Sequence, residues 1–144
     1  MQGFPHRYPV SASAKKDGLV LLDSPGAPQL ASAPPVEFDG PGDQWSPESL
    51  LTASVADCII LTFRAIATAS GLEWNELEMN IDGTLDRVDR VTRFTHFDIQ
   101  ARLRIPAGTD AGKAKQLLEK AEKNCLVSNS LNAEKSIAVS VEVS

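Results

Sequence analysis

The two cysteines, Cys58 and Cys125, are the residues of this chain with the most distinctive chemistry. They lie far apart in the sequence, so they do not form a local CxxC motif. The two histidines, His6 and His96, lie near neither cysteine in the sequence, which gives no support for a Cys/His zinc site or a cysteine hydrolase. We therefore favour thiol redox chemistry by a long-range cysteine pair, although a free cysteine can also be a small buried hydrophobe.

Cys58 lies midway along the longest apolar stretch, residues 46–71. Ser46 is a good N-cap, Pro47 suits the first helical position, and Gly71 suits the position after the helix end. The pattern predicts a long helix over residues 47–70. Its apolar residues do not keep to one stripe, so we expect it to be buried nearly all round. One small sheet cannot cover such a helix, and we expect its spare face to pack against a second copy in a homodimer.

The rest of the chain predicts strands and one further helix around this central helix. Strands alternate in residue type, glycine and proline mark the turns and loops, and the second helix has a narrower apolar stripe. The expected elements are strands 8–16 and 19–22 joined at Asp17-Gly18, an edge strand 29–32, strands 72–85 and 94–105 joined by a polar turn 87–93, a helix 110–124 ending at Cys125, a turn or short helix 126–131, and a strand 137–143. The order predicts one α+β domain over residues 1–144, with a largely antiparallel sheet and an N-terminal hairpin.

Composition and charge argue against some classes of binding partner and some locations in the cell. The net charge is −5, which argues against nucleic acid or an anionic membrane as the main partner. Glu48, Asp57 and Arg64 interrupt the apolar helix, so we do not expect it to span a membrane. The first ten residues lack the apolar region of a secretory signal, and we expect a cytoplasmic protein.

Two motifs carry a resemblance to a known family. The segment SPESLLTASVADCIILTF, followed later by AEKNCLVSNSL, is similar to the OsmC/Ohr family of thiol peroxidases. The shared features are a Ser-Pro-Glu-x-Leu helix start, a cysteine ten residues after the glutamate, and a second cysteine in a C-x-V-S-N-S segment. The resemblance covers nearly the whole chain and implies an OsmC-like fold in an intertwined homodimer.

The resemblance also implies an activity, the reduction of organic hydroperoxides and, more weakly, of hydrogen peroxide. Cys58 would be the peroxidatic thiolate that becomes a sulfenic acid, and Cys125 would be the resolving thiol that forms a disulfide with it. A dithiol reductant, such as a lipoyl-bearing protein, would restore both thiols. The resemblance implies no metal, haem or flavin cofactor.

The family activates its cysteine with an arginine on the N-terminal hairpin turn, held by the glutamate at the helix start. Glu48 matches that glutamate, whereas Lys16 stands where the arginine is expected, with Arg64 and Arg93 as other possible cations. A lysine supplies charge without the planar fork of a guanidinium. Ten helical residues rise about 15 Å, so Glu48 would join the site of Cys58 only through a crossing helix, most simply that of the partner subunit.

Several other residues have plainer expected roles. His96 lies on the polar side of its strand and should be solvated. Asp57 should face solvent or a cation, since it would otherwise disfavour the neighbouring thiolate. Trp45, Phe63 and Trp74 are expected to be core or loop anchors rather than the mouth of a peroxide site. The alternative function is a non-catalytic OsmC-like dimer that binds a small apolar ligand or senses redox state, and the missing arginine favours it.

Overall fold

The computed structural model describes residues 1–144 and divides into two compact units, Met1–Leu50 and Leu51–Ser144. The elements along the chain are β1 (Ser11–Ser13), β2 (Val20–Asp23), β3 (Leu30–Ser32), η1 (Val36–Phe38), α1 (Pro47–Ser70), β4 (Glu76–Val88), β5 (Val91–Ile105), α2 (Ala111–Lys123), η2 (Ser128–Ser130) and β6 (Glu134–Val143). Two helices and two three-stranded, mostly antiparallel sheets make an α+β fold, as predicted. That the chain is a single domain stays a prediction.

The N-terminal unit is a small antiparallel sheet in the order β1-β2-β3. Ser11 pairs with Asp23, and Val20 pairs with Ser32, which confirms the predicted first hairpin and edge strand. Gly18 has φ +97° in the turn between β1 and β2, a conformation in which a side chain would be strained. β1 is shorter than the predicted strand over residues 8–16, because the flanking residues are exposed and make no ladder pairs.

The predicted ends of α1 are confirmed by its capping geometry. The Ser46 hydroxyl accepts from the Ser49 backbone N–H at 3.1 Å, and the Ser46 N–H donates to the Ser49 hydroxyl at 2.9 Å. This reciprocal pair satisfies donors that the first turn leaves without helical partners. At the other end Gly71 has φ +66°, and the Leu72 N–H donates to the Ala67 carbonyl at 2.9 Å. The helix therefore stops where a residue in the left-handed conformation ends it.

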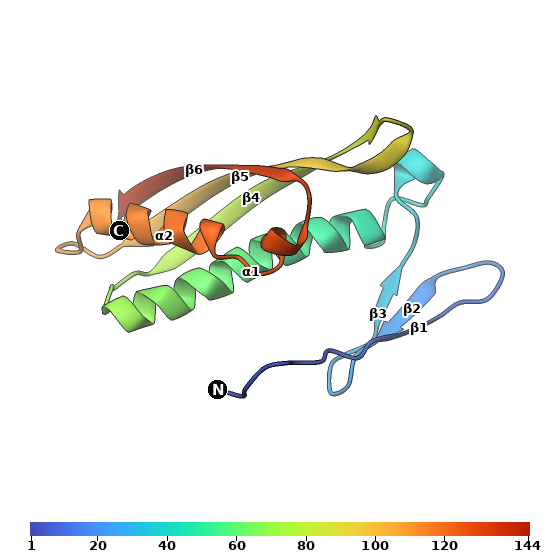
Figure 1. Ribbon diagram of the computed structural model, residues 1–144, viewed down its shortest axis with the longest axis horizontal. Coiled ribbons are helices and arrows are strands. Elements are labelled where there is room, and N and C mark those ends of the chain that lie inside the picture. Colours follow the sequence, from blue (N-terminus) through green and yellow to red (C-terminus); the bar gives the residue numbers. More distant parts are fainter. The chain divides into compact units, whose positions relative to one another are not determined.

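The C-terminal unit is built on a second sheet in the order β4-β5-β6, with both helices on one of its faces (Figure 1). β4 and β5 form a long antiparallel hairpin, and β6 returns parallel to β5. The parallel return is possible because α2 lies between β5 and β6 in the chain and crosses over the sheet. Inward residues of β5, from Phe97 to Ile105, are buried against the helices.

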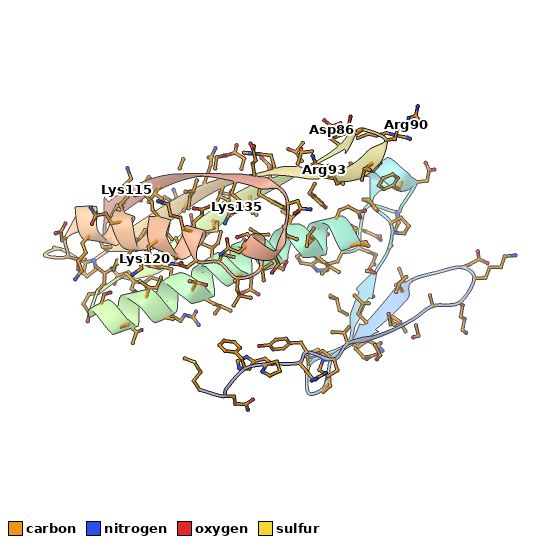
Figure 2. The ribbon with its side chains drawn as sticks, in the orientation of Figure 1. Asp86, Arg90, Arg93, Lys115, Lys120 and Lys135 are labelled. Atoms are coloured by element: carbon orange, nitrogen blue, oxygen red, sulfur yellow. The ribbon has the colours of Figure 1, made fainter.

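The long hairpin differs from the prediction at its turn. A polar turn over residues 87–93 was expected, but β4 continues to Val88 and β5 begins at Val91. Only Asp89 and Arg90 form the turn, with φ of 52° and 69°. Positive φ at both central residues is typical of the two-residue turns that match strand twist. The flanking polar residues are exposed strand residues, and Figure 2 shows Asp86, Arg90 and Arg93 near this end of the hairpin.

Only one stripe of α1 is buried within a single chain. Val55, Ile59, Phe63 and Ala67 recur every four residues and pack in the core with β5 and α2. Leu61, on another side of the helix, is 50% exposed. The other sides of α1 are more exposed because the second sheet and α2 contact this helix from one side only.

The outer face of the second sheet is polar. Arg104 pairs with Glu76 at 2.9 Å, and the His96 ring Nε2 lies 2.9 Å from the Ser136 hydroxyl. His96 lies on this polar face, as expected, and shares a chain of hydrogen bonds that continues from Ser136 to Asp98. These groups are exposed or half-buried at the surface, so each interaction contributes little to stability.

A close approach between β4 and α1 gives the first testable prediction. A Cβ added at Gly83 would lie 2.7 Å from the Thr52 hydroxyl oxygen and 3.0 Å from ring carbons of Phe94 and Phe97. We expect Gly83→Ala to lower the free energy of unfolding by about 1–3 kcal/mol through overpacking, measured by urea denaturation. Gly3→Ala, where nothing lies within 4 Å, is the control. Equal stability of the two variants would contradict this packing.

Candidate functional site

Cys58 lies in the middle of α1, beside the buried stripe rather than within it. It directly precedes the fully buried Ile59 and is itself half-buried. Its Sγ lies 3.9 Å from the Thr62 hydroxyl, one helical turn further on. The residue is thus held by a rigid helix and still keeps part of its surface open.

Cys125 lies just after the C-cap of α2, Asn124, in the segment that leads to β6. It is fully buried and a member of the core cluster. Its carbonyl accepts from the Asn129 N–H at 3.0 Å and from the Ser128 hydroxyl at 3.2 Å, which folds the segment into a tight turn. Its thiol points toward α1, because its Sγ lies 3.9 Å from the Val55 carbonyl oxygen.

Both cysteines are free and lie near each other, since each thiol contributes to the pKa shift of the other. Burial acts to raise the pKa of the Cys58 thiol, but hydrogen bonds from the Val127 backbone, the Cys125 thiol, the Thr62 hydroxyl and the Leu126 backbone outweigh it. The pKa of Cys58 is therefore lowered from its ordinary value. Donors aimed at a sulfur favour the thiolate, which is the nucleophilic form.

The pKa of Cys125 moves in the opposite direction. Burial raises it, and the nearby Cys58 raises it further, whereas hydrogen bonds from the Ser128 side chain and backbone oppose the shift. The pair is thus unequal, with a half-open thiol that ionises easily beside a buried thiol that ionises with difficulty. Such a pair suits nucleophilic attack by Cys58 followed by disulfide formation with Cys125.

The groups that favour the Cys58 thiolate in this chain are hydrogen-bond donors, and no charged side chain is among them. Arg64 is exposed on α1, and the Arg93 Nη1 donates to the Phe94 carbonyl at 3.4 Å at the start of β5. Sequence reasoning looked for a cation and missed Thr62 and the backbone at residues 126–127. Thr62 could have been found, since residues four apart share one helix face.

Glu48 and Lys16 lie in the N-terminal unit. Glu48 is half-buried in the first turn of α1, where a carboxylate also complements the helix dipole. Lys16 is exposed in the connection between β1 and β2, at the hairpin turn predicted from the sequence. Their roles in the site stay predictions.

The remaining sequence predictions concern one acidic residue and three aromatic residues. Asp57 is exposed, as expected. The Phe63 ring is buried and meets Trp74 edge to face, with centroids 5.3 Å apart, so both are core residues. Trp45 is 49% exposed and its carbonyl accepts from the Ala33 N–H at 2.9 Å, which anchors the loop before α1.

Known proteins and a protein-family model match this chain in sequence. The family model described as OsmC-like protein matches residues 40–141. An uncharacterised protein of Bacillus subtilis, YmaD, is 33% identical over 116 residues, which is 76% of each chain. The peroxiredoxin OsmC of Escherichia coli is 28% identical over 89 residues, and the match covers 62% of each chain.

Solved structures share the fold. An OsmC-like protein of unknown function from Vibrio cholerae matches with a TM-score of 0.86 at 15% identity, over 94% of this chain and 100% of its own. An organic hydroperoxide resistance protein OsmC from Legionella pneumophila matches with a TM-score of 0.72 at 23% identity, over 98% of this chain and 100% of its own. Taken with the family match over residues 40–141, these results show that the chain belongs to the OsmC family.

Proposed function

We propose that this protein is a cysteine-based peroxidase that reduces organic hydroperoxides and, more weakly, hydrogen peroxide. The observation that carries the proposal is the convergence of two unlike free thiols at α1: Cys58 is half-buried on this helix, and the buried Cys125 Sγ lies 3.9 Å from the Val55 carbonyl oxygen of the same helix. The pKa of Cys58 is lowered and the pKa of Cys125 is raised. Relatives named as a peroxiredoxin and as organic hydroperoxide resistance proteins support the same chemistry.

The proposed reaction has three steps. The Cys58 thiolate attacks one peroxide oxygen, so that an S–O bond forms, the O–O bond breaks, and the released alkoxide takes a proton to become the alcohol. The Cys125 thiol then loses its proton, and its thiolate attacks the Cys58 sulfur, so that an S–S bond forms, the S–O bond breaks, and the released hydroxide takes up a proton to become water. A dithiol, such as a lipoyl-bearing protein, finally reduces the disulfide and is itself oxidised.

Glu48 and Lys16 complete the proposed site. A cation near the reacting oxygens would stabilise the negative charge that develops as the O–O bond breaks. Lys16 is the residue we assign to this role, with Glu48 holding it. Because Glu48 lies about 15 Å along the helix from Cys58, we assign it to the site of the partner subunit.

The partner in this proposal is a second copy of the chain, in the cytoplasm. By length and composition α1 is apolar enough to cross a membrane, and only 22% of its most apolar 18-residue window is buried in one chain. Asp57 and Arg64 would be costly in a bilayer core, whereas a second α1 would cover the apolar side that includes Leu61. We therefore favour a soluble homodimer.

A non-catalytic redox sensor or small-ligand module is the second candidate. It is favoured by one observation, since the donors that favour the Cys58 thiolate include no cation. A sensor would form the Cys58–Cys125 disulfide with peroxide but would not turn over with excess dithiol, whereas the peroxidase would.

The catalytic roles are tested by peroxide consumption with cumene hydroperoxide and a dithiol. We expect Cys58→Ser to abolish consumption, because it removes the nucleophile. Cys125→Ser should consume about one peroxide per chain and then stall as the sulfenic acid, detected by dimedone labelling. A wild-type protein no faster than Cys58→Ser would end the enzyme proposal.

The lowered pKa of Cys58 predicts the pH dependence of the first step. The thiolate is populated above the pKa, so the rate of sulfenate formation should rise with pH, with a midpoint below that of an ordinary thiol. Stopped-flow oxidation by excess peroxide measures this profile. Thr62→Val removes a donor to the sulfur and should move the midpoint upward, whereas Gln116→Ala, on the exposed side of α2, should not. A wild-type midpoint at or above the ordinary value would refute the assignment.

The dimer is tested through the exposed side of α1. Leu61→Glu places a charge where we expect the partner helix, and should convert the dimer to monomers in light scattering at micromolar concentration. Gln116→Glu adds a similar charge on α2 and should leave the mass unchanged. A monomeric wild-type protein would contradict the composite site.

A further inference from the structure

A lysine stands on the core-facing side of β6. Lys135 pairs in register with the buried Phe97 and precedes Ile137, Val139 and Val141 on the same side of the strand. Figure 2 shows Lys135 beneath β6, on the side where the helices lie. Its side chain is only 14% exposed and pairs with Glu122, 11% exposed, at 3.3 Å. A buried ion pair adds little net stability, so its presence beside Cys125 points to another role.

The ammonium group of Lys135 binds the segment that carries Cys125. It donates to the Ser128 hydroxyl oxygen at 2.7 Å and to the Glu122 carbonyl at 3.0 Å. The Cys125 N–H also donates to the Glu122 carbonyl, at 3.4 Å. One side chain from β6 thus fixes the end of α2 and the turn after it.

The chemistry of the two groups determines which one donates and which one accepts in the hydrogen bond between Lys135 and Ser128. An ammonium group can only donate, so the Ser128 oxygen accepts from it. The single hydroxyl hydrogen of Ser128 is then left to donate elsewhere, and the Cys125 carbonyl lies 3.2 Å away. The Cys125 thiol is a second group on which this side chain acts, since a hydrogen bond from Ser128 lowers the pKa of that thiol.

We propose that Lys135 is a positioning residue for the resolving step: it holds the Ser128 oxygen beside Cys125, so that the Ser128 hydroxyl can turn from the Cys125 carbonyl to the Cys125 thiolate as this forms and stabilise it for attack on the oxidised Cys58. This inference rests on the proposed function. The Ser128 hydrogen bond opposes the effect of burial, which raises the pKa of Cys125. A hydrogen bond passed through a polarised donor is stronger than an isolated one.

The charged and titratable groups around Cys125 come from three elements. Glu122 faces it from α2, Cys58 from α1, and Lys135 from β6 through Ser128. Glu122 pairs with Lys135 at 3.3 Å and cancels much of its charge at longer range. Lys135 therefore acts on Cys125 mainly through the Ser128 hydroxyl.

The experiment titrates Cys125 alone, in full-length protein with Cys58→Ser. The probe is the ultraviolet absorbance of the thiolate against pH, with Cys58→Ser/Cys125→Ser as the baseline. We expect Lys135→Met to raise the midpoint by about 0.5–1 pH unit, as loss of one hydrogen bond to a thiolate would do. Ser128→Ala should give a similar rise, and combining the two should add little, since both break one relay.

The controls separate positioning from folding. Lys120→Met, on the exposed side of α2, should leave the midpoint unchanged, and Lys135→Arg should largely retain it. If Lys135→Met fails to fold, Ser128→Ala still tests the relay, because it leaves the ion pair in place. Unchanged midpoints in folded Lys135→Met or Ser128→Ala would overturn the proposal.

A second readout distinguishes this proposal from the proposed function. With Cys58 and Cys125 both present, Lys135→Met should form the Cys58 sulfenate at the wild-type rate and convert it to the disulfide several-fold more slowly, seen as longer-lived dimedone-reactive protein. If wild-type protein forms no sulfenate, the peroxidase proposal fails, and the titration of Cys125 still decides the role of Lys135. Slowing of both steps together would contradict a role specific to Cys125.

Discussion

Burial of one stripe of α1 is the constraint on which the C-terminal unit depends. Val55, Ile59 and Phe63 are fully inaccessible, and they fill the space between the sheet and α2. Each such side chain contributes about 1.5–3 kcal/mol when it leaves water. Because the stripe fixes the rotation of the helix, it also fixes where Cys58 points. The cysteine lies beside the stripe, where it is covered enough to contact Cys125 and open enough for a reactant to approach.

Cys125 is brought to the middle of α1 by the C-terminal part of the chain. The parallel return of β6 requires α2 to cross the sheet, and the turn after α2 then lies against the middle of α1. The hydrogen bonds of Ser128 and Lys135 hold this turn in shape. One thiol is thus held by a rigid helix, and the other is held by the turn that follows α2.

Thiol activation here differs in kind from simple charge pairing. The Cys58 sulfur receives hydrogen bonds from the backbone at residues 126–127 and from Thr62, all of them neutral donors. Neutral donors stabilise a thiolate without a strong field that would also hold other anions. In the proposed peroxidase, a cation such as Lys16 would then act mainly on the oxygen atoms of the peroxide, which is a separate task from activation of the sulfur.

The sequence by itself determined the elements and the two cysteine motifs. Helix ends were readable at Ser46 and Gly71 because caps are local, and strand 137–143 was readable because alternation is local too. The tight turn at Asp89-Arg90 was missed, since polar residues near a hairpin tip look alike in strand and turn. Only the tertiary structure decided that the Cys125 thiol points toward α1, which donors lower the pKa of Cys58, and that Lys135 binds the turn after Cys125. Those facts depend on contacts between residues far apart in the chain, and no local pattern encodes them.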